Sequence, residues 1–451
     1  MPERPYTYFD YTMSLCPVCL KKIDAKIIFQ DGKVYMTKKC QEHGSWKILL
    51  STDIEYYKFS RNFVKQSEMP YKFAKQVEKG CPYDCGLCTD HEQHSCLTIL
   101  EITETCNLTC PTCYANSAVG KGKHRTLQEI ESMLDMIVAA EKEPDVLQIS
   151  GGEPTLHPEF FTILSMLKES PVKHTMLNTN GIKIANDRAF AEKLAAFSPG
   201  FEVYLQFDSF DPATLIKMRG KDLTKVRERA IATLNELNLS TTLVVTLEKD
   251  SNAEEIGQIL EYAIRQKCVR GVTFQPTQVA GRNDNFSYEH SKITLSEVRN
   301  AIVSQSGLFT EKDIIPVPCN PDALAMGYAL KLDGEVLPLT RYIDPGKLLL
   351  NSENSISFEK NERIREDLLQ IFSTGTSPES QENRLQSLLC CLPSLEAPKL
   401  KYDNLFRVII MNFMDAYDFD VRSVKKSCVH IATTDGRLIP FETMNLLYRD
   451  A

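Results

Sequence analysis

Long apolar runs are missing from this sequence of 451 residues. No uninterrupted apolar stretch reaches the roughly 18 residues that a membrane-spanning helix needs. The first residues, Met1-Pro2-Glu3-Arg4-Pro5, lack the apolar core of a signal peptide. The sequence therefore predicts a cytoplasmic protein without a transmembrane segment, and it leaves open a peripheral contact with a membrane. With 43% apolar and 25% charged residues, the chain is typical of a globular protein of two or three domains.

A basic excess is also missing. The 52 Lys and Arg residues are outnumbered by 60 Asp and Glu residues, so the net charge is −8 and the pI about 5.7. Proteins dedicated to nucleic-acid binding usually show a basic balance. We therefore expect no nucleic-acid partner, and a zinc-knuckle enzyme that acts on RNA is the least favoured function class.

Cysteine, by contrast, is abundant. Ten of the fifteen cysteines precede residue 114, and three of the eight histidines (His43, His91 and His94) lie in the same region. In a reducing compartment, clustered cysteines are metal ligands more often than disulfides. Their spacing divides them into three sets.

The first set consists of two pairs, Cys16 with Cys19 and Cys40 with His43. Between the pairs, residues 25–29 and 33–37 flank Asp31-Gly32, which predicts a hairpin with an Asp-Gly turn. Two knuckles joined by a hairpin predict a closed four-ligand site of zinc-ribbon or rubredoxin type, in a domain of residues 1–60. A structural zinc is favoured over an iron that relays electrons.

The second set, in residues 61–97, has the spacing C-x3-C-x2-C and consists of Cys81, Cys85 and Cys88. Cys96 follows after seven residues and could complete four ligands. We expect an auxiliary iron–sulfur cluster here, with a second structural zinc as the alternative. His91 and His94 are either ligands or local hydrogen-bonding groups, and the spacing does not decide between these roles.

The third set repeats the spacing with Cys106, Cys110 and Cys113, directly after an apolar, strand-like run at Leu97–Ile102. No further cysteine follows before Cys268. Three thiolates can hold three irons of a four-iron cluster and leave the fourth iron without a protein ligand. An incompletely ligated metal is a position where chemistry can occur.

From residue 98 to 285 the pattern alternates between strands and helices. Six strands are predicted, at residues 97–102, 146–150, 175–178, 202–207, 241–247 and 271–275. A helix is predicted after each of the first five, and Thr126-Leu127-Gln128-Glu129 resembles a capping box. This series predicts an α/β fold, a partial (β/α)6 TIM-like barrel. Residues 286–451 form a mixed C-terminal domain, in which Cys390 and Cys391 are expected to be buried by packing.

Polar side chains recur where the strands end, which is where barrels carry their chemistry. The second strand ends in Gly151-Gly152-Glu153-Pro154, where two glycines permit close approach of a ligand and the glutamate could meet an amino group. The third ends in Asn178-Thr179-Asn180-Gly181, suited to a sugar hydroxyl. The fourth carries Gln206 and Asp208, which share one face. Each signal alone also fits an ordinary turn.

The cysteine triad after the first strand and Gly151-Gly152-Glu153-Pro154 after the second resemble the radical S-adenosylmethionine (radical SAM) superfamily. The resemblance covers residues 97 to about 282. It implies that Cys106, Cys110 and Cys113 hold a 4Fe–4S cluster, that Gly151, Gly152 and Glu153 bind the methionine end of SAM, and that Asn178 and Asn180 lie near the ribose. Arg219 is a candidate for the SAM carboxylate, with a surface charge as the alternative. The position before the third cysteine is often aromatic in the superfamily, and here it is Thr112.

The superfamily implies a reaction and partners. The reduced cluster gives one electron to SAM, and the resulting 5′-deoxyadenosyl radical takes a hydrogen atom from an unactivated C–H bond. The protein holds the target carbon near this radical and excludes water and oxygen. A reductase, ferredoxin or flavodoxin is expected as the electron donor.

Over nearly the whole chain, the sequence also resembles the tetraether lipid synthases, relatives that have been described as radical SAM pterin methyltransferases. The shared segments include the three cysteine sets, Gln275-Pro276-Thr277 and Pro316-Val317-Pro318-Cys319. This resemblance implies C–C bond formation or alkylation on a lipid-like substrate, with methylation of a pterin-like molecule as the alternative.

Two departures concern the auxiliary clusters of these relatives. Residues 320–324 carry no cysteine or histidine after Cys319, and Glu442 stands where a cysteine is expected. One auxiliary cluster is therefore expected to be missing or differently ligated, with Cys428 beside His430 as a remaining candidate. A non-catalytic iron–sulfur electron carrier is the alternative to an enzyme, but such a carrier needs neither the Gly-Gly-Glu-Pro turn nor six β/α units.

Overall fold

The computed structural model describes residues 4–64, 69–332, 335–345, 362–373, 377–389 and 400–449. Cys390 and Cys391 lie outside the described residues, so their predicted burial stays a prediction. Over the described ranges, none of the helices combines the length and the apolar character that crossing a bilayer requires.

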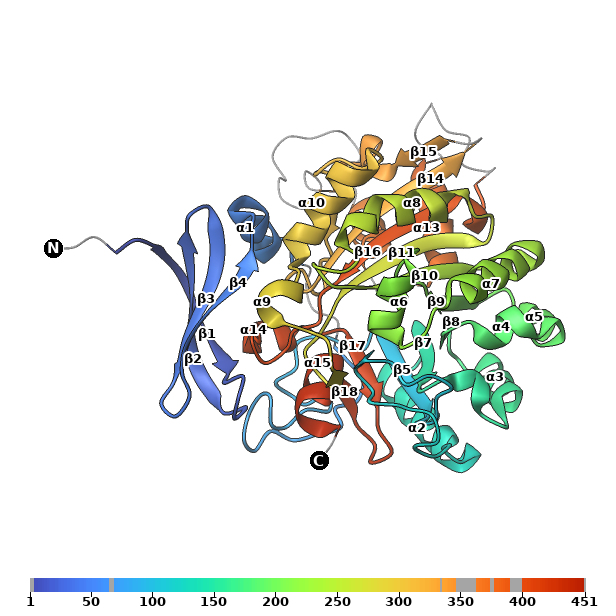
Figure 1. Cartoon of the computed structure of the whole chain (residues 1–451), viewed down its shortest axis with the longest axis horizontal. Coiled ribbons are helices and arrows are strands. Elements are labelled where there is room, and N and C mark those ends of the chain that lie inside the picture. Colours follow the sequence, from blue (N-terminus) through green and yellow to red (C-terminus); the bar gives the residue numbers. More distant parts are fainter. Residues whose placement is uncertain are drawn as a thin grey trace.

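An antiparallel sheet forms the N-terminal part and lies at one end of the molecule (Figure 1). The predicted hairpin is confirmed: Gln30 pairs with Lys33 across Asp31-Gly32, and both turn residues have positive φ, as a tight hairpin turn requires. The flanking strands on either side were not predicted. The elements are β1 (Thr7–Leu15), β2 (Lys22–Gln30), β3 (Lys33–Cys40), β4 (Gly44–Ser51) and the following helix α1 (Ile54–Asn62).

A second, larger sheet contains the six predicted parallel strands as consecutive neighbours. They are rich in β-branched and apolar residues that are buried on both faces, which is typical of parallel strands. The predicted partial barrel is therefore confirmed. Its strands are β5 (Leu97–Thr103), β7 (Val146–Gly151), β8 (His174–Thr179), β9 (Phe201–Gln206), β10 (Thr241–Leu247) and β11 (Val269–Pro276).

Helices follow these strands, and all except the one at residues 212–219 share one apolar core with them (Figure 1). The predicted capping box is present, because the Glu129 amide donates to Thr126 Oγ1 (3.2 Å) and the Thr126 amide donates to Glu129 Oε2 (2.7 Å). The helix that carries Arg219 was not predicted. The helices are α2 (Leu127–Glu141), α3 (Phe160–Glu169), α4 (Ile182–Asn186), α5 (Arg188–Ala195), α6 (Pro212–Arg219), α7 (Thr224–Leu237) and α8 (Ile256–Arg265).

The C-terminal residues extend the same sheet at both of its edges. Strand β16 (Leu405–Met411) runs parallel to β11, and β17 (Val429–Ala432) runs parallel to β5. Within the part of the chain that the structure describes, the sheet ends at β13 and β18 without closing, so the barrel is partial. The domain boundaries after residues 60, 97 and 285 stay a prediction. The remaining strands are β13 (Ile315–Pro316), β14 (Leu324–Leu332), β15 (Glu335–Pro338) and β18 (Leu438–Pro440).

The other helices of this region are α9 (Tyr288–Ser291), α10 (Leu295–Ser306), α12 (Glu362–Ile371), α13 (Pro378–Leu389), α14 (Val421–Val424) and α15 (Phe441–Thr443). Of these, α12, α13 and α15 share an apolar core with the added strands, α10 packs on α8, and α9 and α14 contact the N-terminal sheet. Near the C-terminus, Arg449 donates to Glu101 of β5.

Candidate functional site

A cavity at the carboxyl ends of the parallel strands is lined by Cys106, Cys110 and Cys113. The space between its lining side chains, counted out to the open solvent, is about 1050 Å³. Cys113 belongs to a short strand, β6 (Thr112–Cys113), which pairs with β12 (Arg282–Asn283). Arg282 also donates to the carbonyl oxygens of Cys110 and Ser117, so a residue 172 positions away fixes the cysteine loop. We call this space the triad cavity.

Gly151 and Gly152 line the triad cavity at the end of β7, next to the loop that leads to Cys106. A Cβ at Gly151 would lie 2.1 Å from the carbonyl oxygen of Thr103, and one at Gly152 would lie 2.2 Å from that of Thr105. The Gly152 amide donates to the Thr103 carbonyl at 2.8 Å. The sequence predicted close approach of a ligand at these glycines, and the structure adds a backbone contact that requires glycine at both positions.

Glu153 is buried in the wall of the triad cavity, and its carboxylate connects the ends of two strands. Oε1 accepts from the hydroxyls of Thr155 (2.6 Å) and Thr179 (2.8 Å), and Oε2 accepts from the Asn180 amide (2.9 Å). Burial raises the pKa of Glu153, although these hydrogen bonds oppose the increase. The side chain is thus held rigidly by its own neighbours before any ligand binds.

The predicted amides form a chain along the strand ends. Asn178 donates to Ser150 Oγ (3.1 Å) and accepts from Gln206 Nε2 (2.8 Å). Gln206 in turn accepts from Arg219 (3.0 Å). Asn180 donates to Asn107 Oδ1 (2.7 Å), inside the cysteine loop. Asn178, Asn180, Gln206 and Arg219 all line the triad cavity.

Asp208 is an exception among the predicted site residues, because it does not line the triad cavity. The side chain is fully buried and accepts from Arg219 Nε (2.8 Å) and from Arg227 (2.7 Å). Burial alone would raise the pKa of Asp208, but the two guanidinium groups lower it below the usual value. The expectation that Asp208 binds a cofactor is therefore corrected: it holds Arg219 in place beneath the cavity.

The thiols of the triad are affected by burial and by Arg219. Burial raises the pKa of Cys106 to about 12 and also raises the pKa of Cys110, on which Arg219 has the opposite effect. Because metals bind the thiolate, metal binding at these buried thiols has to displace protons. A guanidinium beside Cys110 favours the anionic ligand set.

An aromatic wall of the triad cavity comes from the C-terminal residues. Phe413 and Phe441 lie 4.0 Å apart between ring centroids, and Phe441 lies 4.9 Å from Tyr114. The Tyr114 hydroxyl is 3.2 Å from Ser150 Oγ. Thr112, at the position that is often aromatic, instead donates to Glu248 (3.3 Å). Sequence reasoning missed Phe413 and Phe441, because nothing in their local sequence indicates that they reach the strand ends.

Further amides line the side of the triad cavity formed after β11. Gln278 donates to the Met414 carbonyl (2.7 Å) and accepts from Asn445 (3.0 Å), and Gln275 donates to the Tyr204 hydroxyl (3.1 Å). Asn283 lines the same side. These residues provide hydrogen-bonding groups in the part of the triad cavity next to the three thiols.

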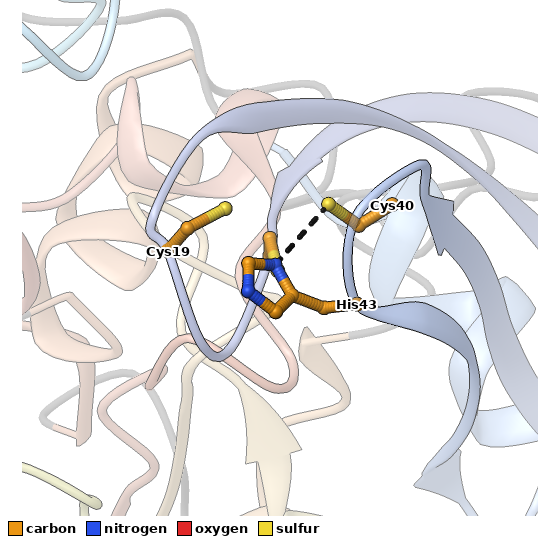
Figure 2. Close-up of side chains that lie close together, drawn as sticks. Cys19, Cys40 and His43 are labelled. Atoms are coloured by element: carbon orange, nitrogen blue, oxygen red, sulfur yellow. Dashed lines mark hydrogen bonds between the residues drawn. The ribbon is translucent and has the colours of Figure 1, made fainter.

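The first cysteine set forms a compact group in the N-terminal sheet. Cys16, Cys19, Cys40 and His43 place one ligand atom each within 4.8 Å of all the others. His43 Nδ1 lies 3.6 Å from the sulfurs of Cys16 and Cys40, and Figure 2 shows its ring between Cys19 and Cys40. Tetrahedral zinc with usual bond lengths places nitrogen and sulfur about 3.6 Å apart. The arrangement fits the predicted single-ion site.

The second cysteine set lines a separate cavity of about 300 Å³ with Cys81, Cys85 and Cys88. Asp84 shapes this loop by accepting from the amides of Glu78 (2.9 Å) and Gly80 (2.7 Å). His91 Nε2 lies 2.8 Å from the Ser427 carbonyl, so this histidine has a local hydrogen-bonding role.

Cys96 does not join the second set as expected. Among the described residues, its close sulfur neighbours are those of Cys319 and Cys428. The expectation that Cys96 completes the second set is corrected. The chain enters β5 at Leu97, and this places the Cys96 thiol next to Cys319 and Cys428.

Comparison with known proteins agrees with this geometry. A family model of the radical SAM superfamily matches residues 100–263, and a model of the HMPTM N-terminal zinc ribbon domain matches residues 8–52. The 7,8-dihydro-6-hydroxymethylpterin dimethyltransferase of Methanocaldococcus jannaschii is 32% identical over 97% of this chain and 94% of its own length. A GTP 3′,8-cyclase of Pasteurella multocida is 27% identical over 42% of this chain and 56% of its own.

Among solved structures, Streptococcus suis SuiB bound to S-adenosylmethionine matches 46% of each chain with a TM-score of 0.39 and 19% identity. The similarity to the pterin dimethyltransferase extends from the zinc ribbon to the C-terminal residues. In this chain the zinc-ribbon match precedes the radical SAM match, and the cysteine triad lies at the strand ends of the partial barrel. The chain belongs to the radical SAM superfamily, and within it to the family of the 7,8-dihydro-6-hydroxymethylpterin dimethyltransferase.

Proposed function

We propose that this radical SAM enzyme transfers methyl groups to a pterin-like small molecule in the triad cavity. The observation that carries the proposal is the convergence of three thiols, two neighbouring phenylalanines and six side-chain amides on one cavity. The amides are those of Asn178, Asn180, Gln206, Gln275, Gln278 and Asn283. Support also comes from the pterin dimethyltransferase that is similar over nearly the whole chain.

The three thiols fit a 4Fe–4S cluster with one open iron, and we assign Cys106, Cys110 and Cys113 as its ligands. When bound, the reduced cluster would supply the electron that cleaves one SAM to methionine and a 5′-deoxyadenosyl radical, and this radical would take a hydrogen atom from the pterin. Because that cleavage leaves the methyl group on methionine, the transferred methyl group would come from a second SAM, which accepts one further electron from the donor protein and leaves as S-adenosylhomocysteine. The chain's own groups then have distinct tasks: Glu153 receives the amino group of SAM and Arg219 its carboxylate. Their fixed hydrogen bonds mean that little reorganisation is needed when the ligand binds.

The ribose and adenine of SAM are assigned to the strand-end amides, Asn178, Asn180 and Gln206. Phe413 and Phe441 then remain available for a flat substrate. A pterin ring can stack on Phe441 and exchange hydrogen bonds with Gln278 and Asn283, because its edge carries both donors and acceptors.

A lipid-like substrate with C–C bond formation, our first expectation, is placed second. Alkyl chains need long apolar walls, since burying amides against hydrocarbon costs free energy unless the amides are paired. The six amides that line the triad cavity offer hydrogen bonds that a small, polar substrate can use and an alkyl chain cannot.

The other metal assignments extend this proposal. We assign an auxiliary iron–sulfur cluster to Cys81, Cys85 and Cys88, and a structural zinc to Cys16, Cys19, Cys40 and His43. A ferredoxin or flavodoxin is the expected class of electron donor, because the reaction consumes single electrons.

The test uses the full chain, reconstituted and reduced without oxygen, with SAM and 7,8-dihydro-6-hydroxymethylpterin. We expect the pterin to increase 5′-deoxyadenosine formation and to gain methyl groups, both measured by mass spectrometry. Cys110→Ala should abolish both products, whereas Cys268→Ala, at a buried thiol outside the three sets, should keep them. If a dialkyl glycerol lipid stimulates the reaction and the pterin does not, the substrate assignment is wrong.

A further inference from the structure

Three buried thiols from distant parts of the chain meet beside the first strand of the barrel. Cys96 precedes β5, Cys319 lies between β13 and β14, and Cys428 precedes β17. Their exposed fractions are 1%, 3% and 0%, and their sulfur atoms all lie within 4.8 Å of one another. The sulfurs of Cys319 and Cys428 are 3.8 Å apart.

A histidine lies beside Cys96, although its ring nitrogens are not within 4.8 Å of all three sulfurs. His94 Nε2 lies 3.5 Å from Cys96 Sγ, and the opposite ring nitrogen, Nδ1, lies 2.8 Å from Glu141 Oε2. The second carboxylate oxygen of Glu141 accepts from the Ser95 amide (3.0 Å), which fixes its position. A carboxylate that orients a histidine from behind is a recurrent feature of histidines that bind metals.

We propose that Cys96, Cys319 and Cys428 bind a single metal ion of the zinc class, and that His94, which Glu141 holds beside Cys96, moves toward the ion and becomes its fourth ligand. Metal–sulfur bonds of about 2.3 Å at tetrahedral angles place two thiolates about 3.8 Å apart, and a thiolate and an imidazole about 3.6 Å apart. The distances of 3.8 Å between Cys319 and Cys428 and of 3.5 Å between His94 and Cys96 match these values. Three sulfurs and one nitrogen are a frequent structural zinc set.

The other cysteine sets of the same chain provide an internal comparison. In an iron–sulfur cubane each thiolate binds a different iron and the bonds diverge, so the sulfurs stand farther apart than around one ion. The triads at 81–88 and 106–113 each line a cavity, and neither brings its three sulfurs within 4.8 Å of one another in the described structure. The zinc-ribbon set and the Cys96 set are both compact. The Cys96 set therefore belongs with the single-ion sites.

The position of this site gives it a structural role. Cys96 and Cys428 start the neighbouring parallel strands β5 and β17, and Cys319 comes from the loop before β14. One ion thus cross-links three segments, of which those of Cys319 and Cys428 are 109 residues apart, and closing such long loops contributes to the stability of the folded chain. It also anchors the C-terminal segment that brings Phe441 to the triad cavity.

The test begins with the unmodified full chain, purified without oxygen and before any cluster reconstitution. Metal analysis is expected to find two tightly bound single ions per chain, one in the zinc ribbon and one here, that survive removal of iron and sulfide. Cys319→Ser and Cys16→Ser should each lower the count to one, and Cys268→Ala should keep two. Cobalt substituted into the Cys16→Ser protein should give thiolate-to-cobalt absorption that is absent after Cys319→Ser is added.

A second variant tests the site without removing a thiol, so that misfolding does not decide the result. Glu141→Gln keeps the side-chain shape and should weaken metal affinity about tenfold or more, measured by transfer of the ion to a chelator. A count of one ion in the unmodified protein would overturn the proposal without any variant. So would loss of several irons together with sulfide in Cys319→Ser, which indicates a cluster, or a disulfide between Cys319 and Cys428 in the anaerobic protein.

Discussion

At the residue scale, the shape of the triad cavity depends on a few positions where no other residue type fits. Gly151 is such a position, because its φ of +123° is unfavourable for other residues and its missing Cβ leaves room for the Thr103 carbonyl. Asp208 is another, since two arginines converge on its buried carboxylate. Gly151 lets the backbone of β7 approach Thr103, and Asp208 fixes the position of Arg219. Together they determine the shape of the site.

Gly151→Ala should disrupt the triad cavity and reduce SAM binding at least tenfold, because the new methyl group collides with the backbone that leads to Cys106. Gly120→Ala is the matched control: its φ is +71°, but a Cβ there meets no atom within 4 Å. The control should lose only about 1–2 kcal/mol of unfolding free energy from backbone strain. Isothermal titration with SAM and urea unfolding measure the two effects, and equal SAM affinity in both variants would contradict the expectation.

Phe441→Leu should raise KM for the pterin by about tenfold while kcat changes less, because a stacking face is worth roughly 0.5–1.5 kcal/mol beyond its buried area. Phe190→Leu, in the aromatic cluster of α3 and α5 away from the cavity, is the matched control. Steady-state kinetics of pterin-dependent 5′-deoxyadenosine formation provide the measurement. An unchanged KM in Phe441→Leu would remove Phe441 from the substrate site.

At the scale of elements, the amino ends of the barrel strands are tied to the C-terminal helices by buried charge. His174, at the start of β8, lies 3.5 Å from Glu202 on β9 and 3.3 Å from Glu379 on α13. Arg407 on β16 donates to Glu202 at 2.9 Å. Burial alone would lower the pKa of His174, but the two carboxylates raise it to about 9. This charge cluster joins four elements on the face opposite the triad cavity.

The raised pKa of His174 predicts a dependence of stability on pH. A histidine whose folded pKa exceeds its unfolded value stabilises the fold fully below pH 6.5, and this stabilisation is lost as the pH rises through about 9. His174→Gln should remove that loss, whereas His290→Gln, at an exposed histidine of α9, should retain it. Urea unfolding between pH 6 and pH 9.5 tests this, and parallel curves for wild type and His174→Gln would refute it.

At the scale of the whole molecule, the N-terminal sheet contacts residues of the C-terminal part (Figure 1). Lys38 donates to the Ala416 carbonyl at 2.7 Å, and Thr12 donates to Asp420 at 2.6 Å. An ion held by Cys16, Cys19, Cys40 and His43 would therefore support a sheet whose contacts reach residues 416–420, close in sequence to Phe413. Loss of this ion should therefore also weaken the contacts between the sheet and residues 416–420.

Removing the zinc-ribbon ion should unfold residues 7–51 first and loosen their contacts with residues 415–422. Cys40→Ser is expected to make the N-terminal sheet accessible to trypsin, while the barrel core stays resistant because its apolar core is separate. Limited proteolysis with mass spectrometry identifies the cleaved segment. Cys268→Ala serves as the control, and cleavage in the barrel before the sheet would contradict this order of unfolding.

The sequence by itself determined the sites whose residues lie close together along the chain. Cys16 to His43, the triad at 106–113 and the glycines after β7 lie close together in the chain, so their geometry follows from a few turns. The six strands could be predicted because parallel strands are continuous apolar runs. The family resemblance, which rests on these same motifs, agrees with the matched relatives.

Only the tertiary structure decided which distant residues meet. Cys96 was expected to join Cys88, eight residues before it, but it lies against Cys319 and Cys428 because β5 and β17 are neighbouring strands. Asp208 was expected in the cavity, but it lies beneath it because α6, which was not predicted, brings Arg219 between them. Contacts between residues more than a hundred positions apart depend on strand order, and strand order is set by packing across the whole sheet.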